Sequence, residues 1–192
     1  MFIEPNINNE RRGCLEVICG SMFSGKTEEL IRRLNMALIA NQKVAIFKPA
    51  LDTRYQENQI VSHDEKAIPS LVISHPEEIL SRSPQVDLIG IDEAQFFDNQ
   101  LSIVCEQLAF QGIRVIVAGL DMDYLGRPFG PIPDLLAKAD YITKLHAICV
   151  QCGQIANYSY RKVNHEARFL IGDKDIYEPR CRNCYTKGEI LA

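Results

Sequence analysis

The segment at residues 20–27, Gly-Ser-Met-Phe-Ser-Gly-Lys-Thr, constrains this chain more than any other stretch of its sequence. It matches the phosphate-binding loop pattern G-x-x-x-x-G-K-[ST] at every fixed position. The glycines let the backbone curl so that N–H groups point at a triphosphate, which Lys26 can also reach, and the Thr27 hydroxyl can bind Mg²⁺. We therefore predict a nucleotide site that is built from Gly20, Ser21, Met22, Phe23, Ser24, Gly25, Lys26 and Thr27.

The residues on either side of this loop have the pattern that such a loop requires. The apolar run at residues 14–19 predicts a buried strand. After the loop, apolar side chains recur at helical spacing, at Leu30, Ile31, Leu34, Ala37 and Leu38. A helix that begins near Lys26 would direct the positive end of its dipole at the same anion. A plain glycine turn between two core elements would not require Lys and Thr at these offsets.

Short apolar segments alternate with helical ones through the rest of the first 145 residues. Strands are predicted at residues 44–48, 70–73, 86–91 and 113–118, and helices at 76–81, 99–111 and 134–138. Loops are predicted at residues 52–64 and 122–133. The alternation predicts an α/β fold with a mostly parallel sheet covered on both faces, the RecA-like core of a P-loop NTPase.

Composition narrows the class of protein. The 192 residues suffice for one α/β domain with a small appendage, and the formal net charge of −4 argues against a protein that grips the nucleic-acid backbone. No apolar run approaches the length that spans a membrane, and residues 1–12 lack the hydrophobic core of a signal peptide. We therefore expect a soluble, cytoplasmic protein without a membrane or nucleic-acid partner.

A second, acidic motif supplies the rest of the expected nucleotide site. Residues 87–93 form a mostly apolar run that ends in Asp92 and Glu93. In phosphate-loop enzymes an Asp at the end of such a strand holds Mg²⁺, so we assign Asp92, with Thr27, to magnesium. Glu93 is then a candidate general base, and the alternative is a solvated acidic turn. Arg54 is the candidate that neutralises phosphate charge, with a plain surface charge as the alternative.

The seven cysteines fall into two groups. Three lie in apolar patterns and are expected to be ordinary buried residues: Cys14, Cys19 and Cys105. The other four form two Cys-x-x-Cys pairs, Cys149 with Cys152 and Cys181 with Cys184. Four thiolates suit a structural, tetrahedral Zn²⁺ with no open position. A redox role for one pair would not explain the other, and His146 is an alternative ligand that four cysteines make unnecessary.

The character of the sequence changes at residue 146, where cysteine pairs and polar turns replace the alternating apolar elements and no long helix is expected. We therefore predict an ATP-binding α/β domain at residues 1–145 and a zinc-binding domain at residues 146–192. The loop between the cysteine pairs carries charges of both signs, which predicts a mixed surface and not a basic patch. These charges are Arg161, Lys162, Arg168, Lys174, Glu166, Asp173 and Asp175.

Further motifs occur in a fixed order along the chain. They are Asp52-Thr-Arg-Tyr55, Ser62-His-Asp64, Asp92-Glu-Ala-Gln-Phe-Phe97, Pro128-Phe-Gly130, and Ile171-Gly172 before Tyr177. With the phosphate loop and the cysteine pairs, they resemble the zinc-containing type II thymidine kinases over residues 14–184. This resemblance implies transfer of the γ-phosphoryl group of ATP to the 5′-hydroxyl of thymidine or deoxyuridine, with Mg²⁺ bound to ATP.

The resemblance also implies roles for individual residues. Glu93 would take the proton of the 5′-hydroxyl, Asp92 would help to hold the metal, and Ala94 and Gln95 would lie near the phosphates. The thymine ring would sit in a box lined by Met22, Phe96, Leu120, Tyr124 and Phe129. A lasso loop between the cysteine pairs would fold over thymidine and contact it through Ser159, Arg168, Phe169, Leu170, Ile171, Gly172 and Tyr177.

Three departures from the family pattern leave this interpretation intact. Tyr124 stands where relatives often carry Phe, Ser159 stands where Thr also occurs, and four cysteines replace the three cysteines and one histidine of some members. The resemblance further implies a homotetramer and inhibition by the end product dTTP.

Two other hypotheses compete with this one. The Asp-Glu-Ala-Gln segment is also similar to the acidic box of helicases, which would indicate a nucleic-acid-stimulated ATPase with a zinc ribbon. A helicase needs two such folds, however, and this chain has room for one. The other hypothesis, a non-enzymatic zinc module with a decayed ATP fold, would predict the loss of Lys26 or Glu93, and both are present.

Overall fold

A computed structural model describes residues 13–51, 59–61, 67–82, 85–163, 172 and 174–190. At its centre is a six-stranded sheet in the order β5-β2-β6-β7-β1-β8, in which each neighbouring pair is parallel. The strands are β1 (Cys14–Gly20), β2 (Val44–Pro49), β5 (Leu71–Ile73), β6 (Leu88–Ile91), β7 (Arg114–Gly119) and β8 (Tyr141–Leu145). The predicted parallel sheet is thereby confirmed.

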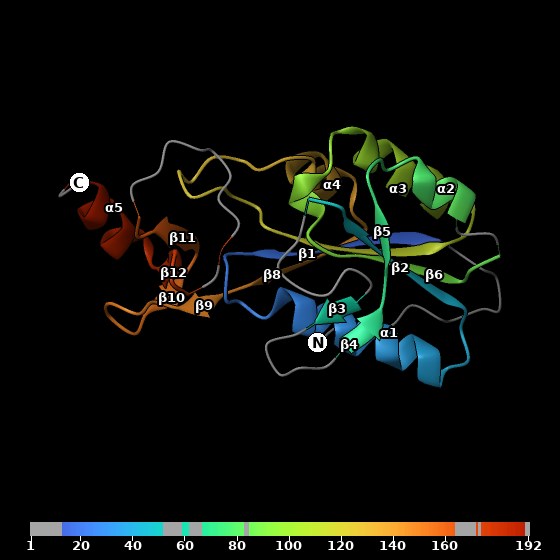
Figure 1. Cartoon of the computed structure of the whole chain (residues 1–192), viewed down its shortest axis with the longest axis horizontal. Coiled ribbons are helices and arrows are strands. Elements are labelled where there is room, and N and C mark those ends of the chain that lie inside the picture. The colour runs from blue at the N-terminus through green and yellow to red at the C-terminus, as the bar shows by residue number, and fades with distance from the viewer. Residues whose placement is uncertain are drawn as a thin grey trace.

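Helices cover both faces of the sheet (Figure 1). On one face lies α1 (Lys26–Ile39), and on the other lie α2 (Glu78–Arg82), α3 (Gln100–Phe110) and α4 (Ile132–Lys138). Alternation along β1 sends Leu15 and Val17 into the buried cluster shared with α3 and α4, while Ile18 joins the cluster shared with α1. No α-helix among the described residues combines the length and the apolar character that are needed to cross a membrane.

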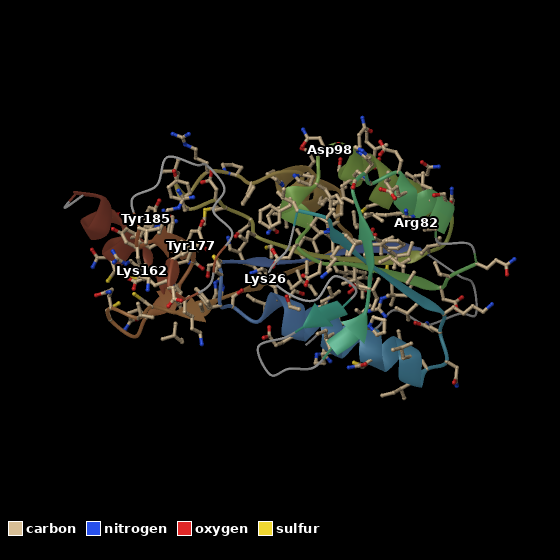
Figure 2. All side chains as sticks on the ribbon, viewed as in Figure 1. Lys26, Arg82, Asp98, Lys162, Tyr177 and Tyr185 are labelled. Atoms are coloured by element: carbon tan, nitrogen blue, oxygen red, sulfur yellow. The ribbon has the colours of Figure 1, made fainter. Side chains whose placement is uncertain are left out.

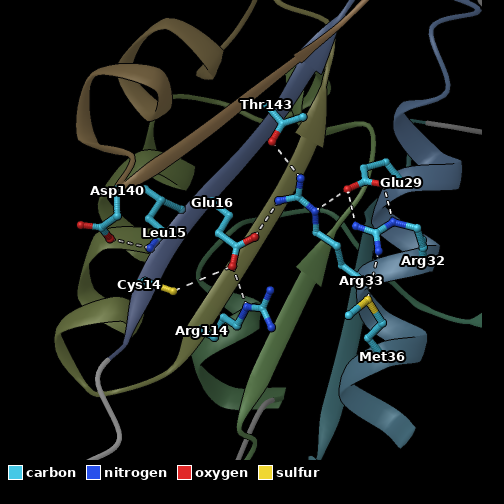
Figure 3. Close-up of polar contacts among 10 residues, drawn as sticks. All are labelled: Cys14, Leu15, Glu16, Glu29, Arg32, Arg33, Met36, Arg114, Asp140 and Thr143. Carbon is cyan, nitrogen blue, oxygen red and sulfur yellow. Dashed lines mark hydrogen bonds and ion pairs between the residues drawn. The ribbon is translucent and has the colours of Figure 1, made fainter. Parts of the chain in front are cut away.

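A charged network interrupts the apolar packing on the α1 side of the sheet (Figure 3). Glu16 of β1 is fully buried, and its carboxylate accepts hydrogen bonds from Arg33 Nη1 at 2.7 Å and from Arg114 Nε at 2.6 Å. Arg33 also donates to Glu29 Oε1 and to Thr143 Oγ1, each at 2.8 Å. These bonds join α1 to three adjacent strands, β7, β1 and β8.

Beyond β8 the chain forms small antiparallel elements. Strand β9 (Ala147–Ile148) pairs with β10 (Ile155–Ala156), and β11 (Tyr158–Arg161) pairs with β12 (Tyr177–Arg180). Helix α5 (Arg182–Ile190) follows, and in Figure 1 this part lies beyond the ends of β1 and β8. A separate hairpin pairs β3 (Gln59–Val61) with β4 (Ala67–Pro69).

Some sequence predictions about the elements are wrong. The edge strand β8 was not expected, because its mostly exposed residues lack the continuous apolar run of a central strand. Helix α4 begins at Ile132 rather than at residue 134, directly after Pro131, whose fixed φ suits a helix start. The nine-residue helix α5 lies in the part where polar turns and no long helix were expected, and β3 occupies part of the expected loop at 52–64. The division of the chain at residue 145 stays a prediction.

Candidate active site

The loop between β1 and α1 has the backbone of an anion-binding turn. Gly20 has a φ of +146°, and a Cβ atom there would lie 2.2 Å from the carbonyl oxygen of Leu145, so this position requires glycine. Gly25, with a φ of +83°, caps α1, which begins at Lys26 as predicted. Lys26 Nζ donates to the carbonyl oxygen of Ser21 at 2.8 Å. Figure 2 shows Lys26 at the end of the sheet nearer the C-terminal elements.

Thr27 and Asp92 meet at the carboxyl edge of the sheet. Thr27 Oγ1 donates to Asp92 Oδ2 at 3.1 Å, and the backbone N–H of Glu93 donates to Asp92 Oδ1 at 3.0 Å. Parallel strands end at one edge, which brings together two residues that are distant in sequence. Burial and then the charge of Glu93 raise the pKa of Asp92 to about 7. A divalent cation at this hydroxyl–carboxylate pair would favour the ionised form.

Glu93 has a backbone conformation that is uncommon for residues other than glycine. Its φ is +51°, in the left-handed region, which costs about 1–2 kcal/mol for a residue other than glycine. Gln95 Nε2 donates to Glu93 Oε2 at 2.5 Å, and Gln95 Oε1 accepts the backbone N–H of Leu120 at 2.9 Å. Gln95 is buried, so this relay fixes the Glu93 carboxylate relative to the end of β7. Strain that is held by surrounding contacts is typical of functional sites.

Three of the residues predicted to line the thymine box lie near Gln95. Phe96 and Phe129 pack edge to face, with their ring centroids 5.8 Å apart. Leu120 contacts Gln95 through the backbone bond described above. A Cβ atom at Gly130 would lie 2.3 Å from the carbonyl oxygen of Gln95, so the segment after Phe129 packs tightly on the same residue. This part of the predicted nucleoside set is therefore adjacent to Glu93.

Strand β11 brings the C-terminal elements against this site. The backbone N–H of Met22, in the phosphate-binding loop, donates to Ser159 Oγ at 3.0 Å. The Arg161 guanidinium lies over the Tyr124 ring, 3.4 Å from its centroid, and Arg161 Nη2 donates to the hydroxyl of Tyr177 at 3.3 Å. Four residues predicted to contact thymidine are thus joined across two parts of the chain, through bonds that the sequence did not indicate.

The prediction that Arg161 belongs to a mixed surface is wrong. Arg161 is 8% exposed and lies between Tyr124 and Tyr177. The signal that could have located it is the alternation of a strand, which puts Ser159 and Arg161 on one face. That strand was not recognised, because the segment was expected to be an inserted loop.

The two cysteine pairs form one cluster that can hold a metal ion. Their four Sγ atoms lie within 4.8 Å of one another, and the four residues are Cys149, Cys152, Cys181 and Cys184. All four are free, and the Sγ atoms of Cys152 and Cys181 are 3.6 Å apart. A tetrahedral zinc ion with Zn–S bonds near 2.3 Å places its sulfurs roughly 3.8 Å apart, so the cluster fits this ion. Among the described residues, His146 is outside the cluster, with its Nδ1 2.5 Å from Asn157 Oδ1.

Several predicted site residues lie outside the described residues. They include the motifs at 52–55 and 62–64, and the individual residues Arg54, Arg168, Phe169, Leu170 and Ile171. Gly172 is described, and a Cβ atom there would lie 2.3 Å from Cδ1 of Ile176. The roles of these residues stay predictions.

Comparisons with known proteins agree with this arrangement. The family model for thymidine kinase matches residues 13–185. A thymidine kinase of Bacteroides fragilis is 56% identical over 189 residues, which cover 98% of this chain and 95% of that relative. A thymidine kinase of Rhodothermus sp. is 58% identical over 173 residues, covering 90% of this chain and 81% of the relative.

Among solved structures, the ATPase DotB of Legionella pneumophila aligns with 75% of this chain and 43% of its own, at 14% identity and a TM-score of 0.44. That likeness is too low to support an inference. The family model, by contrast, covers most of the chain, and the curated relatives match it over nearly their whole length. The chain belongs to the thymidine kinase family.

Proposed function

We propose that this protein transfers the γ-phosphoryl group of ATP to the 5′-hydroxyl of thymidine, and of deoxyuridine, giving the 5′-monophosphate. The observation that carries the proposal is the position of Glu93 beside Asp92, with the Gln95 relay directing the Glu93 carboxylate. Phosphoryl transfer needs held phosphates, neutralised charge and an oriented nucleophile. Two adjacent carboxylates that follow β6, with Asp92 hydrogen-bonded to Thr27 of the phosphate-binding loop, can divide the last two tasks between them.

In this proposal each residue has one task. The N–H groups of the phosphate-binding loop and the Lys26 ammonium hold the ATP phosphates. Thr27 and Asp92 would hold Mg²⁺, which neutralises charge on the β- and γ-phosphates. The 5′-oxygen of the nucleoside forms a bond to the γ-phosphorus, and Glu93 accepts the proton that this oxygen loses. The bond from the γ-phosphorus to the ADP oxygen breaks at the same time.

The nucleoside would lie between this carboxylate and the C-terminal elements. Phe96 and Phe129 offer aromatic faces beside Gln95, and Tyr124 and Tyr177 are held by Arg161 on the other side. Backbone groups at residues 168–172 would read the base edge, and Arg54 would reach the phosphates. We propose that the four-cysteine cluster holds a structural zinc ion, because four thiolates leave no position for substrate.

Regulation and assembly follow as further proposals. We expect dTTP to inhibit the enzyme, since its base can occupy the thymidine site while its phosphates extend toward the loop that holds ATP. A homotetramer is expected from the resemblance to type II enzymes.

Because thiolate ligands persist in a reducing compartment, we also propose that the protein is located in the cytoplasm. The alternative of a nucleic-acid-stimulated ATPase is not favoured, because relatives named thymidine kinase match 90–98% of this chain and 81–95% of their own length.

The test of this function is the replacement of the proposed base. We expect Glu93→Gln to bind ATP and thymidine as the wild type does but to form thymidine monophosphate about a hundredfold or more slowly, the range for the loss of a general base. Calorimetry measures binding, and the product assay measures the rate. The matched control is Glu106→Gln, at a half-exposed glutamate of α3 paired with Lys138, which should keep the wild-type rate. A near-normal rate in Glu93→Gln would remove Glu93 from this role.

A further inference from the structure

The phosphate-binding loop is bound from outside by the C-terminal elements. The N–H of Met22, in the middle of the loop, donates to Ser159 Oγ at 3.0 Å. Ser21 Oγ contacts the carbonyl oxygen of Ala156 at 3.5 Å. Ser159 and Ser21 are both buried, so bulk water competes little with these two contacts. The loop therefore has hydrogen-bond partners in β10 and β11 as well as in its own sequence.

The side chain of Phe23 provides a second attachment. Phe23 packs against a small buried cluster of the C-terminal elements that consists of Ala147, Cys149 and Ala156. The half-buried Cys181 and Cys184 pack against the same cluster. Phe23 therefore packs against a cluster that contains one of the four proposed metal ligands, Cys149, and that two others, Cys181 and Cys184, also pack against. Packing in the loop is continuous with the packing around the metal cluster.

These attachments contact a backbone that has several residues in the left-handed region or with positive φ. Phe23 has a φ of +62°, in the left-handed region that disfavours side chains, and glycines with positive φ lie on both sides of it, at Gly20 and Gly25. A segment of this kind has many alternative conformations, and in most of them the N–H groups do not converge on an anion. External contacts that select one conformation reduce the entropy that nucleotide binding must overcome.

We propose that the C-terminal elements hold the phosphate-binding loop in its anion-binding conformation, with Ser159 as the positioning residue and Phe23 as the anchor. The proposal rests on the nucleotide site proposed above. It gives Ser159 a task that does not involve the base, and it makes nucleotide affinity depend on elements that touch no phosphate. The metal cluster then supports ATP binding as well as the loop between the cysteine pairs.

The test is nucleotide binding in the absence of any nucleoside, so that contacts of Ser159 with a base play no part. We expect Ser159→Ala to bind the magnesium complex of a non-hydrolysable ATP analogue about tenfold more weakly, because the Met22 N–H loses its buried acceptor. Ser159→Thr keeps the hydroxyl and should remain within about twofold of the wild type. Thr186→Ala removes an exposed hydroxyl of α5 that donates to the carbonyl oxygen of Arg182 in the same helix, and it should leave the affinity unchanged.

Two further variants separate the possible failures. Phe23→Ala should weaken the analogue about as much as Ser159→Ala, with the zinc content of both variants unchanged. Wild-type affinity in Ser159→Ala, or a Thr variant as weak as the Ala variant, would overturn the proposal. Lys26→Ala tests the nucleotide site itself, since it should abolish binding whether or not the C-terminal elements hold the loop. Retained affinity in Lys26→Ala would reject the proposed nucleotide site. Lost affinity in Lys26→Ala together with wild-type affinity in Ser159→Ala would reject only the proposed support by the C-terminal elements.

Discussion

At the scale of single residues, the site consists of polar groups whose partners are far away in the sequence. The motif spacing predicted roles for Lys26, Thr27, Asp92 and Glu93, because their chemistry depends on a local pattern that recurs in phosphate-loop proteins. It did not identify Arg161, because burial of an arginine between two tyrosines depends on how separate segments pack. The Gln95 contact with the Leu120 backbone was likewise unpredictable from either segment alone.

The raised pKa of Asp92 makes a prediction about stability. Burial and the neighbouring charge of Glu93 raise this pKa to about 7, whereas the pKa of an Asp in an unfolded chain is about 3.9. Between these values the folded protein keeps a proton that the unfolded protein has lost, so the ligand-free protein loses stability as pH rises from about 4 to about 7.

The variant Asp92→Asn cannot titrate and should not show this loss. We expect its free energy of unfolding to exceed that of the wild type. This difference between variant and wild type should be about 2 kcal/mol larger at pH 8 than at pH 5. Urea denaturation of the magnesium-free protein at the two pH values measures this difference. Asp134→Asn, on an exposed position in the first turn of α4, is the control and should show little dependence on pH. An equal effect of Asp92→Asn at both pH values would contradict the expectation.

At the scale of elements, the sheet was predictable where its strands are buried and unpredictable where they are not. Strands β1, β6 and β7 are apolar runs, and the sequence located each of them to within a few residues. Strands β8, β11 and β12 have exposed or polar residues in place of a continuous apolar run, so their strand conformation depends strongly on their pairing partners. Those weak strands carry Ser159, Arg161 and Tyr177.

Helix α1 carries two neighbouring arginines in opposite surroundings. Arg33 is 2% exposed and bonds the fully buried Glu16, while Arg32 is half-exposed and bonds Glu29 on the helix surface. We expect Arg33→Ala to lower the free energy of unfolding by about 3–5 kcal/mol, because it removes one of the two arginines that compensate the buried carboxylate. Arg32→Ala should cost less than about 1 kcal/mol. Chemical denaturation compares the two variants. Equal losses of unfolding free energy would show that the buried bonds of Arg33 contribute no more to stability than the surface bonds of Arg32.

At the scale of the whole molecule, the candidate active site lies where the parallel sheet meets the C-terminal elements. The sheet edge supplies the groups for phosphate and metal, and the C-terminal elements supply Ser159, Arg161 and Tyr177. Figure 2 labels Lys26 of the first set and Tyr177 of the second. The sequence predicted both parts, through two motifs of fixed spacing. It did not predict that the metal cluster and the phosphate-binding loop share one packed cluster through Phe23, since no pattern links the two motifs.

The metal cluster makes a prediction at this scale. We expect Cys181→Ser to lower the bound zinc and to raise the thymidine concentration needed for half-maximal rate, before it lowers the melting temperature of the sheet. The physical reason is that a missing ligand loosens the C-terminal elements, while the sheet keeps its own core. Cys14→Ser, at a cysteine outside the cluster, should keep one zinc ion per chain. Unchanged zinc content in Cys181→Ser would count against the four-cysteine site.

The claim on which the rest depends is that thymidine accepts the γ-phosphoryl group. The most direct measurement follows labelled γ-phosphate from magnesium-bound ATP when thymidine, deoxycytidine and single-stranded DNA are offered in turn. We predict labelled thymidine monophosphate with thymidine, and no labelled product with deoxycytidine or single-stranded DNA. Hydrolysis of ATP that ignores thymidine but rises with single-stranded DNA would contradict it, and would assign the Asp92–Glu93 pair to a nucleic-acid-dependent ATPase.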